Sequence, residues 1–196
     1  MMRHALGVIL LFVVGSAQAA TVSIDFEDLP ADGAFSTPLL TQGFVIDPAL
    51  APNQPAIFDD WSGSGTGHEL GLCGFCAPGP TEGISIYRAD ATTFELDSFD
   101  LRFWTKLHTG TVTGYLAGGG TVTQALSIAG IINFDQSWVN LTSIDIVIDS
   151  NLVNPSLDDV TFMDNFTLQA VPVPAAAWLF GSGLGLLGWL RRRQTA

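Results

Sequence analysis

Asp164 is an acidic residue in a stretch whose apolar side chains recur at every second position. Val160, Phe162, Phe166 and Leu168 share its parity, so in a β-strand its carboxylate is expected to point into the core with them. A carboxylate in a core must be paired with a cation, hydrogen-bonded or bound to a metal. The alternatives are a bulge that turns Asp164 outward and a hydrogen bond from backbone amides.

A cysteine pair, Cys73 and Cys76, lies in a stretch rich in glycine and proline. In an oxidising compartment this pair is expected to form a disulfide that closes a small loop. A C-x-x-C oxidoreductase would need a helix after the second cysteine, and Pro78 and Pro80 do not permit one. A metal site that adds His68 is the other alternative, although a fourth ligand is not obvious.

Tryptophans are candidates for sugar binding, because an exposed aromatic ring can stack on the face of a sugar. Trp61 lies in a loop rich in Asp, Gly and Ser and is the residue predicted to contact a ligand, with ordinary loop packing as the alternative. Trp138 precedes Asn140 and Leu141 at strand parity, so we expect it in the core.

Signals for catalysis are weak. Neither His68 nor His108 is flanked by a serine motif such as G-x-S-x-G, and no glycine loop leads from a strand into a helix to hold a nucleotide. The carboxylate pair of a glycoside hydrolase is defined by separation in space, so that alternative stays open. We expect a protein that is not an enzyme.

Length and charge limit the scaffold that positions these residues. The chain has 196 residues, which suits one ordinary domain with short additions. Its 7 basic residues against 19 acidic ones give a net charge of −12, and Arg3 and Arg191–Arg193 lie near the two ends. Nucleic-acid binding is excluded because phosphate contacts require a basic surface. The mean hydropathy of +0.37 is high because apolar residues gather at both ends.

The central residues 21–170 carry the short alternating patterns of half-buried strands, as in Val22–Phe26 and Ser143–Asp149. Gly118–Gly120 separates two runs rich in Thr and Val and predicts a hairpin. Residues 47–80 are expected to form long surface loops. The pattern predicts an all-β fold, an antiparallel β-sandwich of jelly-roll type. Further strands are predicted at Phe44–Ile46, Ile84–Arg88, Thr93–Leu96, Phe99–Thr105, Val112–Ala117, Val122–Ile128 and Val160–Leu168.

The first 20 residues are typical of a secretory signal peptide. A short basic start precedes an apolar run, Ala5–Val14, and Ala17 and Ala19 then stand in A-x-A spacing. The secretion machinery and signal peptidase are therefore the expected partners of residues 1–20. An uncleaved membrane anchor is the alternative.

The C-terminal residues 171–196 contain an uncharged stretch, Ala175–Leu190, that ends at Arg191–Arg193. As a helix, 175–190 would be about 24 Å long, which only marginally crosses a bilayer. The arginines would hold the C-terminus in the cytoplasm and leave the central domain outside. A plain single-pass anchor in the inner membrane is one interpretation of this transmembrane helix.

The tail also has a specific order: the proline motif Val171–Ala175, the apolar run Trp178–Leu184, and Arg191–Arg193. In this order it resembles the PEP-CTERM family of bacterial sorting signals, in its VPLPA-type variant, with Val173 in place of the usual Glu or Leu. The resemblance implies an exosortase-type membrane protease or transpeptidase as partner, an inner-membrane intermediate, and a final place in the cell envelope or outside the cell, often with exopolysaccharide. The residues that match the sorting motif are Val171, Pro172, Val173, Pro174, Ala175, Arg191, Arg192 and Arg193.

Four segments of the central domain resemble exported bacterial jelly rolls of the galactose-binding-like or carbohydrate-module type. In such domains a structural calcium is often held by acids of the first strand and an aspartate of the last. The positions that match are Asp25, Glu27 and Asp164, so the resemblance implies Ca²⁺ at these residues as the one possible cofactor. The four segments are Ile24–Leu29, Val112–Thr123, Trp138–Ile144 and Met163–Leu168.

Together these features favour an exported, non-enzymatic protein of the envelope or extracellular matrix, processed by an exosortase and associated with exopolysaccharide or biofilm. A carbohydrate-binding module with a defined sugar site is the alternative. A small polysaccharide hydrolase is the third.

Overall fold

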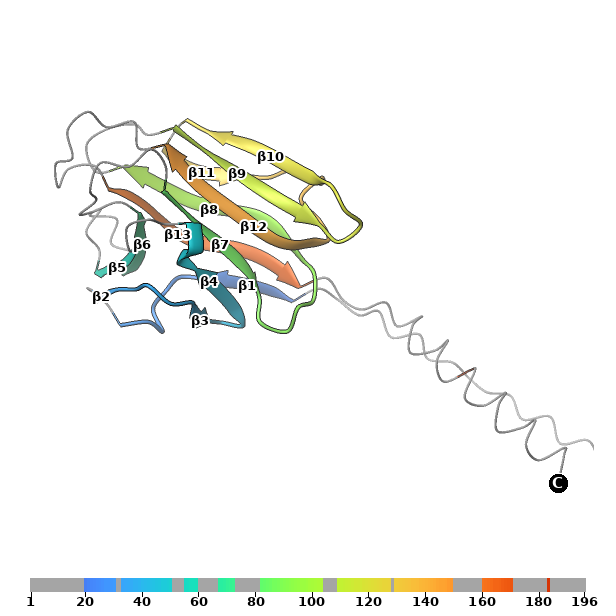
Figure 1. The fold of residues 1–196 in the computed structure, drawn as a ribbon, viewed down its shortest axis with the longest axis horizontal. Coiled ribbons are helices and arrows are strands. Elements are labelled where there is room, and N and C mark those ends of the chain that lie inside the picture. Colours follow the sequence, from blue (N-terminus) through green and yellow to red (C-terminus); the bar gives the residue numbers. More distant parts are fainter. Residues whose placement is uncertain are drawn as a thin grey trace, which may run out of the picture. The chain divides into compact units, whose positions relative to one another are not determined.

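The computed structural model describes residues 20–30, 33–50, 55–59, 67–72, 82–103, 109–127, 129–149, 160–170 and 183. Its strands belong to one compact unit, Ala20–Val171 (Figure 1). The predicted signal peptide, sorting motif and helix 175–190 fall outside the described residues except at Ala20 and Gly183. The part that the structure describes contains no helix long and apolar enough to cross a membrane.

One antiparallel sheet folds back on itself to give two layers (Figure 1). The first layer, sheet I, has the strand order β3-β4-β7-β12-β9-β10. Hydrophobic residues alternate with polar ones along these strands, as half-buried strands require. The strands of sheet I are β3 (Leu39–Thr41), β4 (Phe44–Asp47), β7 (Glu82–Arg88), β12 (Leu141–Asp149), β9 (Thr109–Leu116) and β10 (Thr121–Leu126).

The second layer, sheet II, has the order β2-β5-β6-β13-β8-β11, with β1 also paired to β13. A single pairing, Leu141 with Phe94, joins the two layers. A 3₁₀ turn, η1 (Pro48–Leu50), follows β4. The strands of sheet II are β1 (Thr21–Ile24), β2 (Gly33–Ala34), β5 (Ala56–Asp59), β6 (His68–Leu72), β8 (Phe94–Phe103), β11 (Gly130–Asn133) and β13 (Thr161–Ala170).

The main core is made by inward side chains of both layers. Ile144 and Ile146 of β12 are fully buried in it. From sheet II, Phe166 stacks on Phe99 with ring centroids 4.8 Å apart and meets Phe26 edge-on at 6.0 Å. Such aromatic pairs add to the stabilisation from burial itself. Trp138 is also buried here, as predicted, although it lies in the turn between β11 and β12 and not in a strand.

A second, smaller apolar cluster comprises Phe58, Val160 and Phe162, with Ala56 packed against it. Phe58 and Phe162 meet edge-on at 5.5 Å between ring centroids. Their neighbours Ile57 and Met163 belong to the main core, so this cluster lies on the opposite side of sheet II. Sheet II is thus buried on both sides at this end.

The predicted all-β, antiparallel, jelly-roll-like architecture is confirmed. The hairpin at Gly118–Gly120 is confirmed as well, since it connects β9 to β10, and Gly119 and Gly120 have φ of 87° and 91°. Positive φ is the conformation that glycine adopts without strain. The two predicted strands around residues 93–105 form one strand, β8.

The expectation that residues 47–80 form only surface loops is wrong. This region contains β5 and β6, and Glu69–Leu72 of β6 are all buried. Strand β6 has no apolar alternation because both of its sides are covered. Its composition therefore does not separate it from a loop.

The expectation that Asp164 shares a core with Phe166 and Leu168 is also wrong. The register between β13 and β8 shifts after Asp164, and Asn165 has a positive φ of 50°. This bulge reverses the parity of the strand. Asp164 is buried, at 2 % exposure, but it lies on the side of Phe162 and the smaller cluster.

Candidate functional site

Two of the residues predicted to bind calcium lie just beyond β1 rather than in it. Asp25 Oδ1 accepts hydrogen bonds from Gln42 Nε2 at 2.9 Å and from the Glu27 amide at 3.3 Å. Glu27 Oε1 accepts one from the His68 amide at 2.8 Å. The strand ends at Ile24 because Phe26 adopts a φ of 58°, outside the β region.

The third predicted ligand, Asp164, is held by the residue that follows it. Its Oδ1 accepts the Asn165 amide at 2.7 Å, and its Oδ2 accepts Asn165 Nδ2 at 3.1 Å. Asn165 Nδ2 also lies 3.1 Å from Asp100 Oδ2 of β8. The carboxylate is therefore hydrogen-bonded, which was one of the alternatives left open by the sequence.

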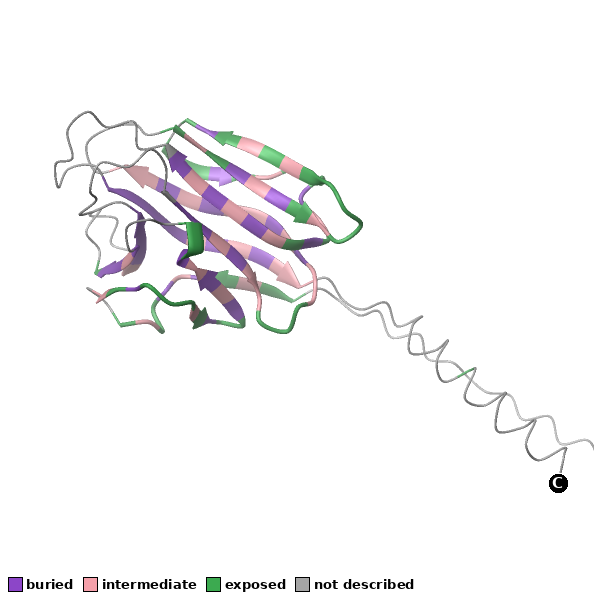
Figure 2. Cartoon of the chain, in the orientation of Figure 1, coloured by how far each residue is buried: buried purple, intermediate pink, exposed green. Residues whose placement is uncertain are grey.

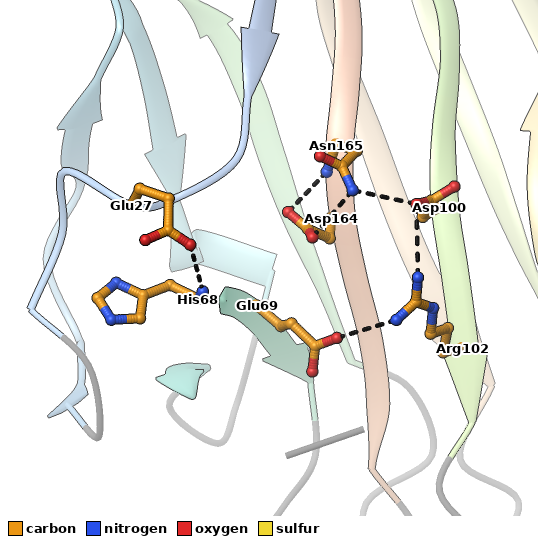
Figure 3. A network of polar contacts seen from close by, with 7 residues as sticks. All are labelled: Glu27, His68, Glu69, Asp100, Arg102, Asp164 and Asn165. Carbon is orange, nitrogen blue, oxygen red and sulfur yellow. Dashed lines mark hydrogen bonds and ion pairs between the residues drawn. The ribbon is translucent and has the colours of Figure 1, made fainter. Parts of the chain in front are cut away.

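An arginine links these acids to the neighbouring strand β6 (Figure 3). Arg102 of β8 lies 3.6 Å from Asp100 and 3.4 Å from Glu69, whose side chain is fully buried. A buried carboxylate requires such a partner because desolvation penalises its charge. In Figure 3 Glu27 and His68 stand apart from this group, while Glu69, Arg102, Asp100, Asn165 and Asp164 form a continuous polar network across β6, β13 and β8.

The described residues contain no group of three or more His, Cys, Asp or Glu side chains that could hold a metal ion. Asp25, Glu27 and Asp164 are thus not gathered into a calcium site, although β1 and β13 are neighbours as expected. Each of the three carboxylates is instead engaged by protein donors. Calcium at these residues stays a prediction.

The calcium hypothesis predicts that EDTA lowers the melting temperature of the purified protein relative to CaCl₂. The reason is that a ligand bound only by the folded state stabilises it by mass action. Asp164→Ala should abolish the difference between the two buffers. Equal melting temperatures for the wild-type protein in the two buffers would contradict the hypothesis.

The outward side of sheet I carries a second candidate site, which we call the tyrosine face. Inward residues of β7, β12 and β9 belong to the main core, so the residues between them point to the other side. Figure 2 shows this alternation of buried with intermediate or exposed residues along the strands. The tyrosine face comprises Leu40, Val45, Asp47, Ser85, Tyr87, Thr113, Tyr115, Thr121, Thr123, Ser143 and Asp145.

Strand register arranges this face in two rows that run across the strands. The first row is largely apolar and aromatic, with Val45, Tyr87, Ser143 and Tyr115 in consecutive register. The second row lies beside the first, two residues away on each strand, and it is polar. It contains Asp47, Ser85, Asp145, Thr113 and Thr123.

Each tyrosine reaches from the first row to a carboxylate of the second. The Tyr115 hydroxyl donates to Asp145 Oδ2 at 2.8 Å, and the Tyr87 hydroxyl donates to Asp47 Oδ2 at 3.4 Å. Ser85 Oγ donates to Asp145 Oδ1 at 2.6 Å, which fixes that carboxylate from the other side. Both rings therefore lean diagonally along the sheet instead of standing out from it.

Burial and these contacts together raise the pKa of both phenols above the usual value. For Tyr115 the main cause is the hydrogen bond to Asp145, followed by the charge of that carboxylate. For Tyr87 the main cause is burial, followed by the charge of Asp47 and the hydrogen bond to it. Both hydroxyls thus stay protonated donors throughout the neutral range.

An alkaline titration of tyrosinate absorbance tests this arrangement directly, because Tyr87 and Tyr115 are the 2 tyrosines of the chain. Both should ionise above pH 10, the ordinary range for the phenol. Since the folded-state pKa is raised, the stability that these contacts contribute is present below about pH 10 and is lost as pH rises through the folded pKa.

Asp145→Asn removes the charge beside Tyr115 and should return the pKa of that phenol toward its usual value. Asp90→Asn is the matched control, because Asp90 is paired with Arg88 and not with a tyrosine. An ordinary titration of both phenols in the wild-type protein would contradict the described hydrogen bonds.

Other predicted site residues lie outside the described part of the chain: Trp61, Cys73 and Cys76. Sugar contact by Trp61 and the disulfide between the cysteines stay predictions. Sequence reasoning did not single out Tyr87 and Tyr115. The available signal was their position at the polar parity of strongly alternating strands, where an aromatic residue is unusual.

Comparison with known proteins adds little to this geometry. No family model matches the chain, and neither does any curated protein. The similar solved structures include an agarase, AgWH50C, at 13% identity over 69% of this chain and 23% of that chain, with a TM-score of 0.40.

Two further structures show the same level of similarity. An exo-beta-agarase is similar at 11% identity over 77% of this chain and 25% of that one, with a TM-score of 0.42. A family 16 carbohydrate binding module is similar at 15% identity over 74% of this chain and 92% of that one, with a TM-score of 0.31. The chain thus spans about a quarter of the length of the two agarases.

Proposed function

We propose that this chain is an exported, non-enzymatic protein whose β-sandwich binds polysaccharide through the tyrosine face. The observation that carries the proposal is the pair of tyrosine–carboxylate contacts, Tyr115 with Asp145 and Tyr87 with Asp47, on the outward side of sheet I. This favours the carbohydrate-binding interpretation of the sequence, and we propose that its site lies on sheet I and not at Trp61 alone.

The chemistry of the tyrosine face suits a sugar polymer. A pyranose ring has an apolar face of C–H groups and an edge of hydroxyls. The leaning rings of Tyr87 and Tyr115 offer a flat apolar surface to the C–H face of the sugar. A tyrosine side chain has only two torsions, so little conformational entropy is lost when the ring is fixed on binding. The carboxylates of the polar row can accept hydrogen bonds from the hydroxyl edge of the sugar, and the hydroxyls of that row can both accept and donate them.

The tyrosine contacts also make these rings a preorganised surface. Hydrogen bonds to Asp47 and Asp145 restrict both rings before any ligand arrives, and ordering of side chains is one of the main costs of association. Asp145 is in turn fixed by Ser85. The geometry therefore supports binding by a fixed surface rather than by loop closure.

A glycan array with the purified domain tests this function. The proposal predicts saturable binding to at least one polysaccharide, and the array is repeated with Trp61→Ala to separate the loop tryptophan from the sheet surface. Absence of binding to every glycan would overturn the proposal and leave a passive matrix protein. Release of reducing ends from a bound polymer would instead support the hydrolase alternative.

The cellular part of the proposal rests on the two ends of the sequence. We propose export through the predicted signal peptide and processing of the tail by an exosortase at the Val171–Ala175 motif. Exosortase processing would place the sugar-binding domain at the cell envelope or in the exopolysaccharide around the cell. This would bring the tyrosine face into contact with its polymer.

Intact mass measured in two bacterial hosts tests the processing step. A product that ends near Val171–Ala175 is expected only in the host that has an exosortase, with the N-terminus near Thr21 in both hosts. An intact tail in both hosts would mean that residues 175–190 act as a plain membrane anchor. That result would leave the sugar-binding proposal standing, because the two depend on different parts of the chain.

A further inference from the structure

We infer that the ligand of the tyrosine face is an uncharged, extended polysaccharide that lies across the strands of sheet I, with alternate sugar rings on Tyr115 and Tyr87. This inference rests on the proposed function and adds the class and direction of the polymer. It follows from a repeat in the surface itself.

The two tyrosine–carboxylate contacts are related by a translation of two strands across the sheet. Tyr115 of β9 donates to Asp145 on β12, and Tyr87 of β7 donates to Asp47 on β4. In the strand order β9, β12, β7, β4 each tyrosine reaches to the next strand, and both lean from the first row to the second. The surface thus presents the same unit twice, in the same orientation.

The spacing of the units is set by the sheet. Tyr115 and Tyr87 share a register row with Ser143 of β12 between them, so they are two strand spacings apart, about 10 Å. This is comparable to the length of a disaccharide in an extended chain. A polymer with every second ring in the same orientation would place equivalent rings on the two tyrosines.

The two rows also define the direction of the ligand. The apolar row with both tyrosines and the polar row with both carboxylates run side by side, perpendicular to the strands. A chain that lies along these rows keeps its ring faces on the first row and its hydroxyl edge on the second. A chain parallel to the strands would meet one tyrosine at most.

The negative charge of the tyrosine face and of the whole chain favours an uncharged polymer as ligand. The six strands of sheet I contain a single basic residue, Arg88. Its guanidinium lies over the Phe44 ring at 5.5 Å and forms an ion pair with Asp90 at 2.7 Å, so it is engaged away from the tyrosine face. With Asp47 and Asp145 on the surface and a net charge of −12 on the chain, a polyanion would be repelled.

The preference for an uncharged polymer is tested by affinity electrophoresis of the domain in gels that contain a neutral polymer or its anionic counterpart. The pairs are hydroxyethyl cellulose with carboxymethyl cellulose, agarose with carrageenan, and laminarin with sulfated laminarin. The inference expects retardation by a neutral member and none by its anionic counterpart at low salt. Equal or stronger retardation by the anionic member would overturn the inference while confirming that the domain binds polysaccharide.

The claim that one ligand covers both tyrosines is tested by titration calorimetry with oligosaccharides of the polymer that binds, from disaccharide to hexasaccharide. The affinity should rise about tenfold once the oligosaccharide is long enough to cover both tyrosines, and then level off. Tyr87→Ala and Tyr115→Ala should each remove this step, with little effect on the shortest ligand. A length dependence that neither substitution alters would overturn the arrangement across the strands but not the proposed function.

Discussion

The double substitution Tyr87→Ala with Tyr115→Ala is expected to weaken retention of the domain by polysaccharide strongly without unfolding it. Each ring should contribute about 0.5–1.5 kcal/mol to binding, so each single substitution weakens the affinity by up to about tenfold. If the two contributions add, the double variant falls about 100-fold or less below the wild-type affinity. Affinity electrophoresis measures this loss.

Two controls separate the rings from other effects. Tyr87→Phe with Tyr115→Phe keeps the rings but loses the hydrogen bonds to Asp47 and Asp145, so retention should be intermediate. Ile131→Ala removes an apolar side chain that is 65% exposed on sheet II and should leave retention unchanged. Wild-type retention in the double alanine variant would rule out the tyrosine face as the binding site.

The fold was largely predictable because its signal is local. In β12 and β9, apolar residues alternate with polar ones, and a strand with one buried side has to show that pattern. The hairpin between β9 and β10 was predictable for the same reason, since consecutive glycines favour a tight turn in which φ is positive. None of these inferences required knowledge of which strands pair.

The candidate site was less predictable because it depends on pairing between strands far apart in the sequence. Tyr87 and Tyr115 become neighbours in one row only because β7 and β9 both pair with β12. A side chain such as Asp145, which receives hydrogen bonds from Ser85 and Tyr115, has no sequence signal for either contact. The bulge at Asn165, which reverses the parity of Asp164, is hidden for a related reason, because it appears only in the register against β8.

In strand β6, which the sequence did not predict, Gly71 leaves the space that a buried aromatic ring occupies. Gly71 pairs with Ala56 on one side and with Phe162 on the other. A Cβ atom at this position would lie 2.3 Å from Phe58 Cε2 and 2.6 Å from Phe58 Cδ2. The missing side chain is what allows the buried Phe58 ring to cross β6 and meet Phe162 edge-on.

Gly71→Ala is therefore expected to destabilise the domain by about 2–3 kcal/mol, because the added methyl group overpacks a buried aromatic cluster. For a domain of this size that corresponds to a fall of about 4–12 °C in melting temperature, measured by calorimetry. Gly118→Ala is the matched control, because a Cβ there meets nothing within 4 Å and should leave the melting temperature nearly unchanged. Phe58→Leu shortens the obstructing ring, so in that background Gly71→Ala should cost less, and a double-mutant cycle measures the difference. Equal effects of Gly71→Ala in both backgrounds would show that Phe58 does not pack over Gly71, and the assignment of a structured β6 inside the glycine-rich region would lose its main energetic support.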